Sequence, residues 1–170
     1  MRDIHTRNDF GPALNELGLV YLGVIVGVKR GEFADMLLKT WYGTRLMLVA
    51  DSANVDDMNA CAERIVRHKG RFVVWHMAES EAAERWCNES FDFIYLDNEH
   101  PALVAWYPKV KPGGVFAGKL HTNALVFAKL NDIEAQTTTD SFYWQKPELE
   151  CVGAIPSTEP PAKPTRARRI

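Results

Sequence analysis

The chain lacks several features that would place it in a specialised class of protein. It has only three cysteines among 170 residues and no Cys-x-x-Cys pair, so neither a disulfide framework nor a zinc site of paired cysteines is indicated. No apolar run approaches the roughly 20 residues of a membrane-spanning helix. The net charge is only −2, so we expect no nucleic-acid partner. The amino terminus lacks the apolar core of a signal peptide, and we therefore expect a cytoplasmic protein.

What is present is an alternation of apolar runs and amphipathic segments. Apolar, β-branched runs predict strands within 19–28, 45–51, 71–77, 91–96 and 114–118. Apolar residues at helical spacing predict helices over 32–41, 55–68, 80–86 and 123–130. Segments 133–139 and 141–146 alternate and are rich in aromatic residues and threonine, which predicts a closing antiparallel pair. This order indicates an α/β fold with a mostly parallel sheet wrapped by helices.

The chain length suits one domain, which we expect to span residues 1–150. Within it, residues 1–18 would form an N-terminal helical or lid segment. Residues 151–170 are rich in proline and arginine and poor in large apolar residues, so this tail is expected to be disordered. Four tryptophans are expected in the core or at the surface of a homodimer: Trp75, Trp86, Trp106 and Trp144.

The strongest candidate site follows the run 91–96. Asp97 ends that run, and His100 comes three residues later. Open α/β sheets bind ligands outside the carboxyl ends of their strands, so both side chains are expected near a ligand. A carboxylate there could hold a divalent metal or orient a ligand. An imidazole could act as a general base near neutral pH.

Weaker candidates follow the three earlier strands. Gly27 and Gly31 bracket a strand-to-helix turn, where glycines let a ligand approach the backbone, although an ordinary turn explains them as well. Asp51 could accept hydrogen bonds from a ribose or cap the turn that follows it. Glu79 and Ser80 lie where adenine docks in such folds, with Ser80 as a helix N-cap as the structural alternative.

Six segments in the same order resemble small class I S-adenosylmethionine-dependent methyltransferases. The segments are 6–19, 27–34, 37–41, 91–100, 106–114 and 143–147. The most similar group often carries Tyr-Ile-Asp-x-x-His and Pro-Gly-Gly motifs, which this chain has as Tyr95-Leu-Asp97-Asn-Glu-His100 and Pro112-Gly-Gly114. The resemblance implies a Rossmann-like sheet of seven strands, mostly parallel with an antiparallel closing strand, and helices on both faces. It also implies that S-adenosylmethionine binds across the strand tips.

The resemblance also implies roles for single residues. Gly27, Val28 and Gly31 would bind the methionine part of the cofactor, and Asp51 would approach its ribose. Glu79 and Ser80 would lie near the adenine. Asp97 would take the metal or substrate-side position, and His100 would be the base.

This chain departs from the family pattern at several points. Ile25 replaces an acid that helps to hold the cofactor, and Ala50 stands where the usual ribose-binding acid aligns. The stretch between His100 and Trp106 is about half a dozen residues short. Lys119-Leu-His121 replaces His-Asp-Tyr, which removes the second metal carboxylate, so a divalent metal held by Asp97 alone would bind weakly.

Three functions follow from these residues. The first is methyl transfer to a small hydroxyl-bearing acceptor, with or without a metal. The second is a degenerate methyltransferase fold that binds cofactor or a partner without turnover. The third, a nicotinamide-dependent oxidoreductase, is less favoured because the first turn lacks Gly-x-Gly-x-x-Gly.

Overall fold

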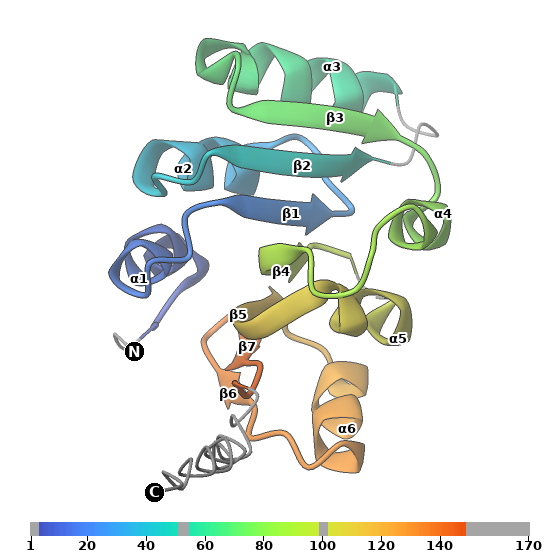
Figure 1. Cartoon of the computed structure of the whole chain (residues 1–170). Coiled ribbons are helices and arrows are strands. Elements are labelled where there is room, and N and C mark those ends of the chain that lie inside the picture. The colour runs from blue at the N-terminus through green and yellow to red at the C-terminus, as the bar shows by residue number, and fades with distance from the viewer. Residues whose placement is uncertain (1–3, 51–54, 99–101, 149–170) are drawn as a thin grey trace, which may run out of the picture.

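The computed structural model describes residues 4–50, 55–98 and 102–148. Seven strands form one sheet: β1 Leu22–Val26, β2 Arg45–Ala50, β3 Phe72–His76, β4 Phe91–Leu96, β5 Val110–Lys119, β6 Gln136–Thr137 and β7 Ser141–Gln145. Their order is β3-β2-β1-β4-β5-β7-β6 (Figure 1). Strands β1 to β5 pair in parallel, and β7 runs antiparallel to both of its neighbours. The predicted fold class and the antiparallel closing pair are confirmed.

In the part of the chain that the structure describes, six α-helices accompany the sheet: α1 Phe10–Glu16, α2 Glu32–Thr40, α3 Val55–Ile65, α4 Glu79–Glu84, α5 Leu103–Trp106 and α6 Thr122–Leu130. Three short 3-10 turns extend or precede them: η1 Arg7–Asp9, η2 Val66–His68 and η3 Tyr107–Lys109. Among the described residues, no helix has both the length and the apolarity needed to cross a membrane.

The sheet has one hydrophobic core on each face. Helices α1, α2 and α3 cover one face, and α4, α5 and α6 cover the other. Because successive residues of a strand point to opposite faces, Tyr95 packs into the first core and Ile94 into the second. Strand β4 is therefore buried on both faces, which explains its continuous apolar run.

The strand order reverses direction between β1 and β4. From β1 the chain continues through α2 to β2 on one side, whereas β5 lies on the other side of β4. In open α/β sheets, a crevice forms outside the carboxyl ends of the strands at such a switch point. The fold thus places residues 27–31 and 97–98 at the edge where a ligand is expected.

A buried acid fixes the opposite edge of the sheet. Asp92 is 2% exposed and accepts hydrogen bonds from the backbone N–H groups of Tyr21 at 2.5 Å and Leu22 at 3.2 Å. Lys111 also forms an ion pair with it. These contacts tie the start of β1 to β4 and β5 and provide the partners that a buried charge requires.

The four tryptophans expected in the core or at a dimer surface divide into two pairs. Trp106 and Trp144 are buried in the core. Trp75 and Trp86 are half-buried and stack on each other, with ring centroids 5.5 Å apart. The second pair packs against the core that lies under α4.

Candidate active site

A polar cavity of about 280 Å³ opens at the carboxyl ends of β1 and β4. The two strand ends are joined by a hydrogen bond from the backbone N–H of Asp97 to the carbonyl of Val26, at 2.8 Å. The lining residues come from η1, the end of β1 with the turn after it, the start of α2, the end of β4, β5 and the turn before β7. They are Arg7, Ile25, Val28, Lys29, Arg30, Gly31, Glu32, Phe33, Ala34, Tyr95, Asp97, Lys119 and Asp140.

The turn after β1 folds back over β2. The N–H groups of Gly27 and Val28 both donate to the carbonyl of Val49, each at 3.0 Å. Gly27 has a φ of 81°, which residues with a side chain rarely adopt. A Cβ at this position would lie 3.1 Å from the Cβ of Asn98 and 3.2 Å from Oε1 of Glu79. Glycine is therefore required here both by the backbone and by the crowded strand tips.

Gly31 serves the packing of two helices as well as the cavity wall. Its φ is 75°, and a Cβ would lie 2.8 Å from the Sγ atom of Cys61 in α3. Gly31 is also the N-cap of α2, and no side chain caps this helix start. Because the first N–H groups of a helix have no partner within the helix, they form a natural site for an anion.

Asn98 and Glu79 meet beside Gly27. The side-chain amide of Asn98 donates a hydrogen bond to Oε1 of Glu79. The Oδ1 atom of Asn98 is buried and has no hydrogen-bond donor among the described residues. Glu79 thus reaches the centre of the sheet edge, although it belongs to the first turn of α4. Asn98 was not predicted from the sequence, because a single asparagine after a strand resembles any turn residue.

Ser80 lies away from this contact. It is exposed on the first turn of α4, and the N-cap of that helix is Ala78. The capping role suggested for Ser80 is therefore wrong. The helix begins one residue earlier than predicted, so Ser80 already has a helical position.

The carboxyl group of Asp97 is partly buried in the cavity wall. Burial raises the pKa of Asp97 above its ordinary value. Three nearby cations counteract part of this rise in the pKa: Arg7, Lys29 and Lys119. Asp97 can therefore exchange a proton at a higher pH than an exposed aspartate.

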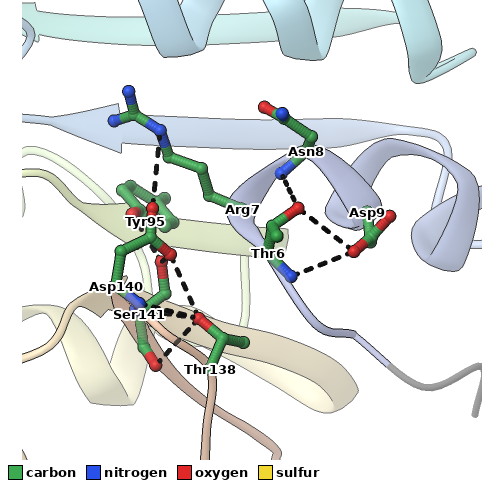
Figure 2. Close-up of polar contacts among 8 residues, drawn as sticks. All are labelled: Thr6, Arg7, Asn8, Asp9, Tyr95, Thr138, Asp140 and Ser141. Atoms are coloured by element: carbon green, nitrogen blue, oxygen red, sulfur yellow. Dashed lines mark hydrogen bonds and ion pairs between the residues drawn. The ribbon is translucent and has the colours of Figure 1, made fainter.

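A second group of polar side chains closes the cavity on the side of β7 (Figure 2). The hydroxyl of Ser141 bonds to Oδ1 of Asp140 at 2.9 Å and lies 3.0 Å from the hydroxyl of Tyr95. The Nε atom of Arg7 lies 3.8 Å from Oδ2 of Asp140. Residues from the beginning, middle and end of the chain thus form one network, and only the fold brings them together.

Two predicted site residues, Asp51 and His100, lie outside the described residues, as does the tail 151–170. Ile25 and Ala50, which replace acids of the family pattern, are buried. Among the residues of the described ranges, no three His, Cys, Asp or Glu side chains gather closely enough to hold a metal ion.

Comparisons with known proteins identify the fold. No protein-family model matches the sequence, and no curated protein sequence matches it. The structure is similar to a methyltransferase from Geobacter sulfurreducens, with a TM-score of 0.68 and 10% identity over 87% of this chain and 81% of that one. An O-methyltransferase from Bacillus cereus, solved in complex with SAH, has a TM-score of 0.60 and 18% identity over 83% and 82%.

A third similar structure is not named as a methyltransferase. Spermidine synthase from Thermotoga maritima has a TM-score of 0.63 and 14% identity, covering 85% of this chain and 61% of that one. The chain therefore has the fold of class I methyltransferases, as the resemblance implied. The reaction must be argued from the site, since one fold supports several activities.

Proposed function

We propose that this chain is an S-adenosylmethionine-dependent methyltransferase that acts on the hydroxyl group of a small acceptor. The observation that carries the proposal is the polar cavity at the switch point between β1 and β4, with Asp97 in its wall and the uncapped start of α2 beside it. Its volume of about 280 Å³ is close to the lower end of the roughly 300–1,000 Å³ that is usual for small-molecule sites.

The residues around the cavity match the chemical groups of S-adenosylmethionine. The start of α2, with Lys29 and Arg30 next to it, suits the carboxylate of the methionine part. The carboxylate of Asp97 suits the positive sulfonium. The buried Oδ1 atom of Asn98 needs a donor, which a ligand beside Gly27 could provide. We propose Glu79 as a second acceptor for the adenosyl part and Asp51 for its ribose.

Bound S-adenosylmethionine would supply the activated methyl group. The protein then needs to align the acceptor hydroxyl and remove its proton. We propose His100 as the base, three residues beyond Asp97. The carboxyl group of Asp97, with its raised pKa, would orient His100 or take the proton itself.

A metal ion is not needed for this arrangement. A divalent cation at Asp97 would have the ammonium group of Lys119 lining the same cavity, and their charges would repel. The role of Asp97 as a metal ligand is therefore the weaker proposal. Its role beside the sulfonium and the acceptor is the stronger one.

Calorimetric titration with S-adenosylhomocysteine tests the proposal directly. We expect saturable binding to the native chain and its loss in Gly27→Val, whose side chain would enter the space next to Asn98 and Glu79. Tighter binding of a dinucleotide than of S-adenosylhomocysteine would instead indicate the oxidoreductase. Cofactor binding without methyl transfer to any of a broad panel of phenols and alcohols would indicate the degenerate binding module.

We also propose that the protein is cytoplasmic and forms a homodimer. A homodimer would cover the half-buried pair Trp75 and Trp86. Light scattering at several protein concentrations, with Trp86→Ala as the comparison, tests that arrangement.

A further inference from the structure

Arg7, a charged residue of the cavity wall, lies over an aromatic ring and faces a carboxylate. Its guanidinium carbon lies 5.9 Å from the centre of the Phe33 ring, and its Nε atom faces Asp140. The two terminal nitrogens point away from Asp140 (Figure 2). Neither forms a hydrogen bond with any residue of the described ranges. Arg7 therefore presents the forked end of its guanidinium group without a partner among those residues.

Hydrogen bonds fix both the backbone of Arg7 and the carboxylate that faces it. On one side, Thr6 and Asp9 form a capping box, in which Oδ2 of Asp9 accepts from the N–H of Thr6 at 3.0 Å. The box fixes η1 and hence the backbone of Arg7. On the other side, Oδ1 of Asp140 accepts from the hydroxyl groups of Ser141 at 2.9 Å and Thr138 at 3.1 Å. The carboxylate that faces Arg7 is thus oriented by two hydroxyl donors.

Two aromatic rings lie next to the guanidinium group. The rings of Phe33 and Tyr95 have centroids 4.1 Å apart and both line the cavity. Both rings are almost fully buried, with 3% of Phe33 and 1% of Tyr95 exposed, so they pack beneath Arg7 and leave little ring surface for a ligand. The buried rings therefore support the cation of Arg7 at the cavity wall, where an acid can reach it.

The cofactor does not need Arg7 for its own carboxylate. The start of α2, with Lys29 and Arg30, already provides an anion site, whereas Arg7 comes from η1. Among the described residues, the cavity lining contains the cationic side chains of Arg7, Lys29, Arg30 and Lys119. Arg7 is thus a cation of the cavity wall that remains available for a second anion when the start of α2 holds the first.

We propose that Arg7 binds the carboxylate of the methyl acceptor, and that the acceptor is a small hydroxy acid. This inference rests on the proposed methyltransferase function. The planar fork of arginine can donate two parallel hydrogen bonds to a carboxylate, which a lysine cannot do. Arg7 would hold the acid end of the acceptor at the cavity wall. The hydroxyl group would then extend towards Asp97.

Matched pairs of an acid and its neutral amide test this assignment. The protein is saturated with S-adenosylhomocysteine and titrated with 3- and 4-hydroxybenzoate and with 3- and 4-hydroxybenzamide. We expect the native chain to bind one acid about tenfold or more tightly than its amide, because a charge-assisted pair is formed. Arg7→Gln should abolish that preference, and Arg7→Lys should restore only part of it.

Arg45→Gln is the matched control, since Arg45 is exposed at the amino end of β2, the opposite edge of the sheet. It should keep the preference for the acid, and melting curves should show that all variants are folded. Equal binding of acid and amide by the native chain, binding of neither, or a preference that survives Arg7→Gln would overturn the assignment.

Two further outcomes separate this inference from the proposed function. If Arg7→Gln weakens S-adenosylhomocysteine but not 5′-methylthioadenosine, which lacks the amino-acid end, Arg7 holds the cofactor, and the acceptor assignment is wrong. If the native chain binds no S-adenosylhomocysteine, the proposed function fails and this inference fails with it. Cofactor binding that is equal in the native chain and Arg7→Gln supports the assignment.

Discussion

The hydroxyl groups of Tyr95 and Ser141 lie 3.0 Å apart and join β4, which leads to Asp97, to the antiparallel strand β7. Burial raises the pKa of Tyr95 to about 12, while the hydrogen bond with Ser141 lowers it in part. The phenol therefore stays neutral at physiological pH. It is a structural link in the cavity wall and not a base for the acceptor.

This link gives a prediction for alkaline stability. A tyrosine in the unfolded chain has a pKa of about 10. Because the folded-state pKa is higher, the contribution of Tyr95 is complete below pH 10 and is lost as the pH rises towards 12. Between pH 8 and pH 11, the free energy of unfolding, measured with urea, should fall by about 1.4 kcal/mol more in the native chain than in Tyr95→Phe. Equal losses in the two proteins would contradict the raised pKa.

The carboxyl group of Asp97 gives a prediction for ligand charge. S-adenosylmethionine carries a sulfonium and S-adenosylhomocysteine a neutral thioether, so only the first gains from an ionised Asp97. As the pH falls through the raised pKa of Asp97, the preference for S-adenosylmethionine should shrink by about fivefold, since a nearby unit charge contributes ~1 kcal/mol or more. Calorimetry from pH 8 to pH 4 measures the ratio of affinities. Asp97→Asn should have a small ratio that does not change with pH.

The glycines allow a matched test of backbone strain and cavity space. Gly18 has a φ of 69°, and an added Cβ would meet nothing within 4 Å, so Gly18→Ala should cost only the ~1–2 kcal/mol of a left-handed backbone. Gly31→Ala should cost ~1–3 kcal/mol more in urea unfolding, because its Cβ would meet Cys61. Gly27→Ala should weaken S-adenosylhomocysteine, and Gly18→Ala should not. Similar affinities in these two variants would remove Gly27 from the site.

A buried ion-pair cluster between α2 and η2 gives a prediction for acid stability. Asp35 accepts two hydrogen bonds from Arg67 at 2.6 Å and one contact from His68 at 2.8 Å, and Lys39 forms a further ion pair. Burial alone would raise the pKa of Asp35, but hydrogen bonds from Arg67, Lys39 and His68 outweigh it and hold the pKa well below the ordinary value. The cluster therefore stabilises the fold above pH 4, and its contribution is lost as the pH falls further.

Substitution of Asp35 tests this cluster. Asp35→Asn should lower the free energy of unfolding at pH 7 by ~2 kcal/mol, a value reduced for the half-exposed Arg67. Between pH 6 and pH 3, the free energy of unfolding should fall by ~1 kcal/mol more in the native chain than in Asp35→Asn. Glu81→Gln removes an exposed ion pair with Arg85 and should change little at any pH. An Asp35→Asn protein as stable as the native chain would refute the role of the cluster.

Side-chain periodicity predicts that a strand exists better than it predicts the residues at which the strand begins and ends. Strand β5 was predicted over 114–118 but spans Val110–Lys119. Its pairing with β4 shifts register between Phe91 and Phe93, and this irregularity accommodates Pro112 and Gly113. Strand β1 ends at Val26, before the end of its apolar run, because Gly27 turns the backbone with a φ of 81°.

The sequence by itself determined the alternation of strands and helices, the parallel sheet and the position of Asp97 at a strand tip. These features depend on side-chain periodicity and on local turn residues, which act over a few positions of the chain. Only the tertiary structure decided that Arg7 faces Asp140, that Asn98 bonds to Glu79 and that Gly31 lies against Cys61. Such contacts depend on how helices pack on the sheet, and packing joins residues that no local pattern relates.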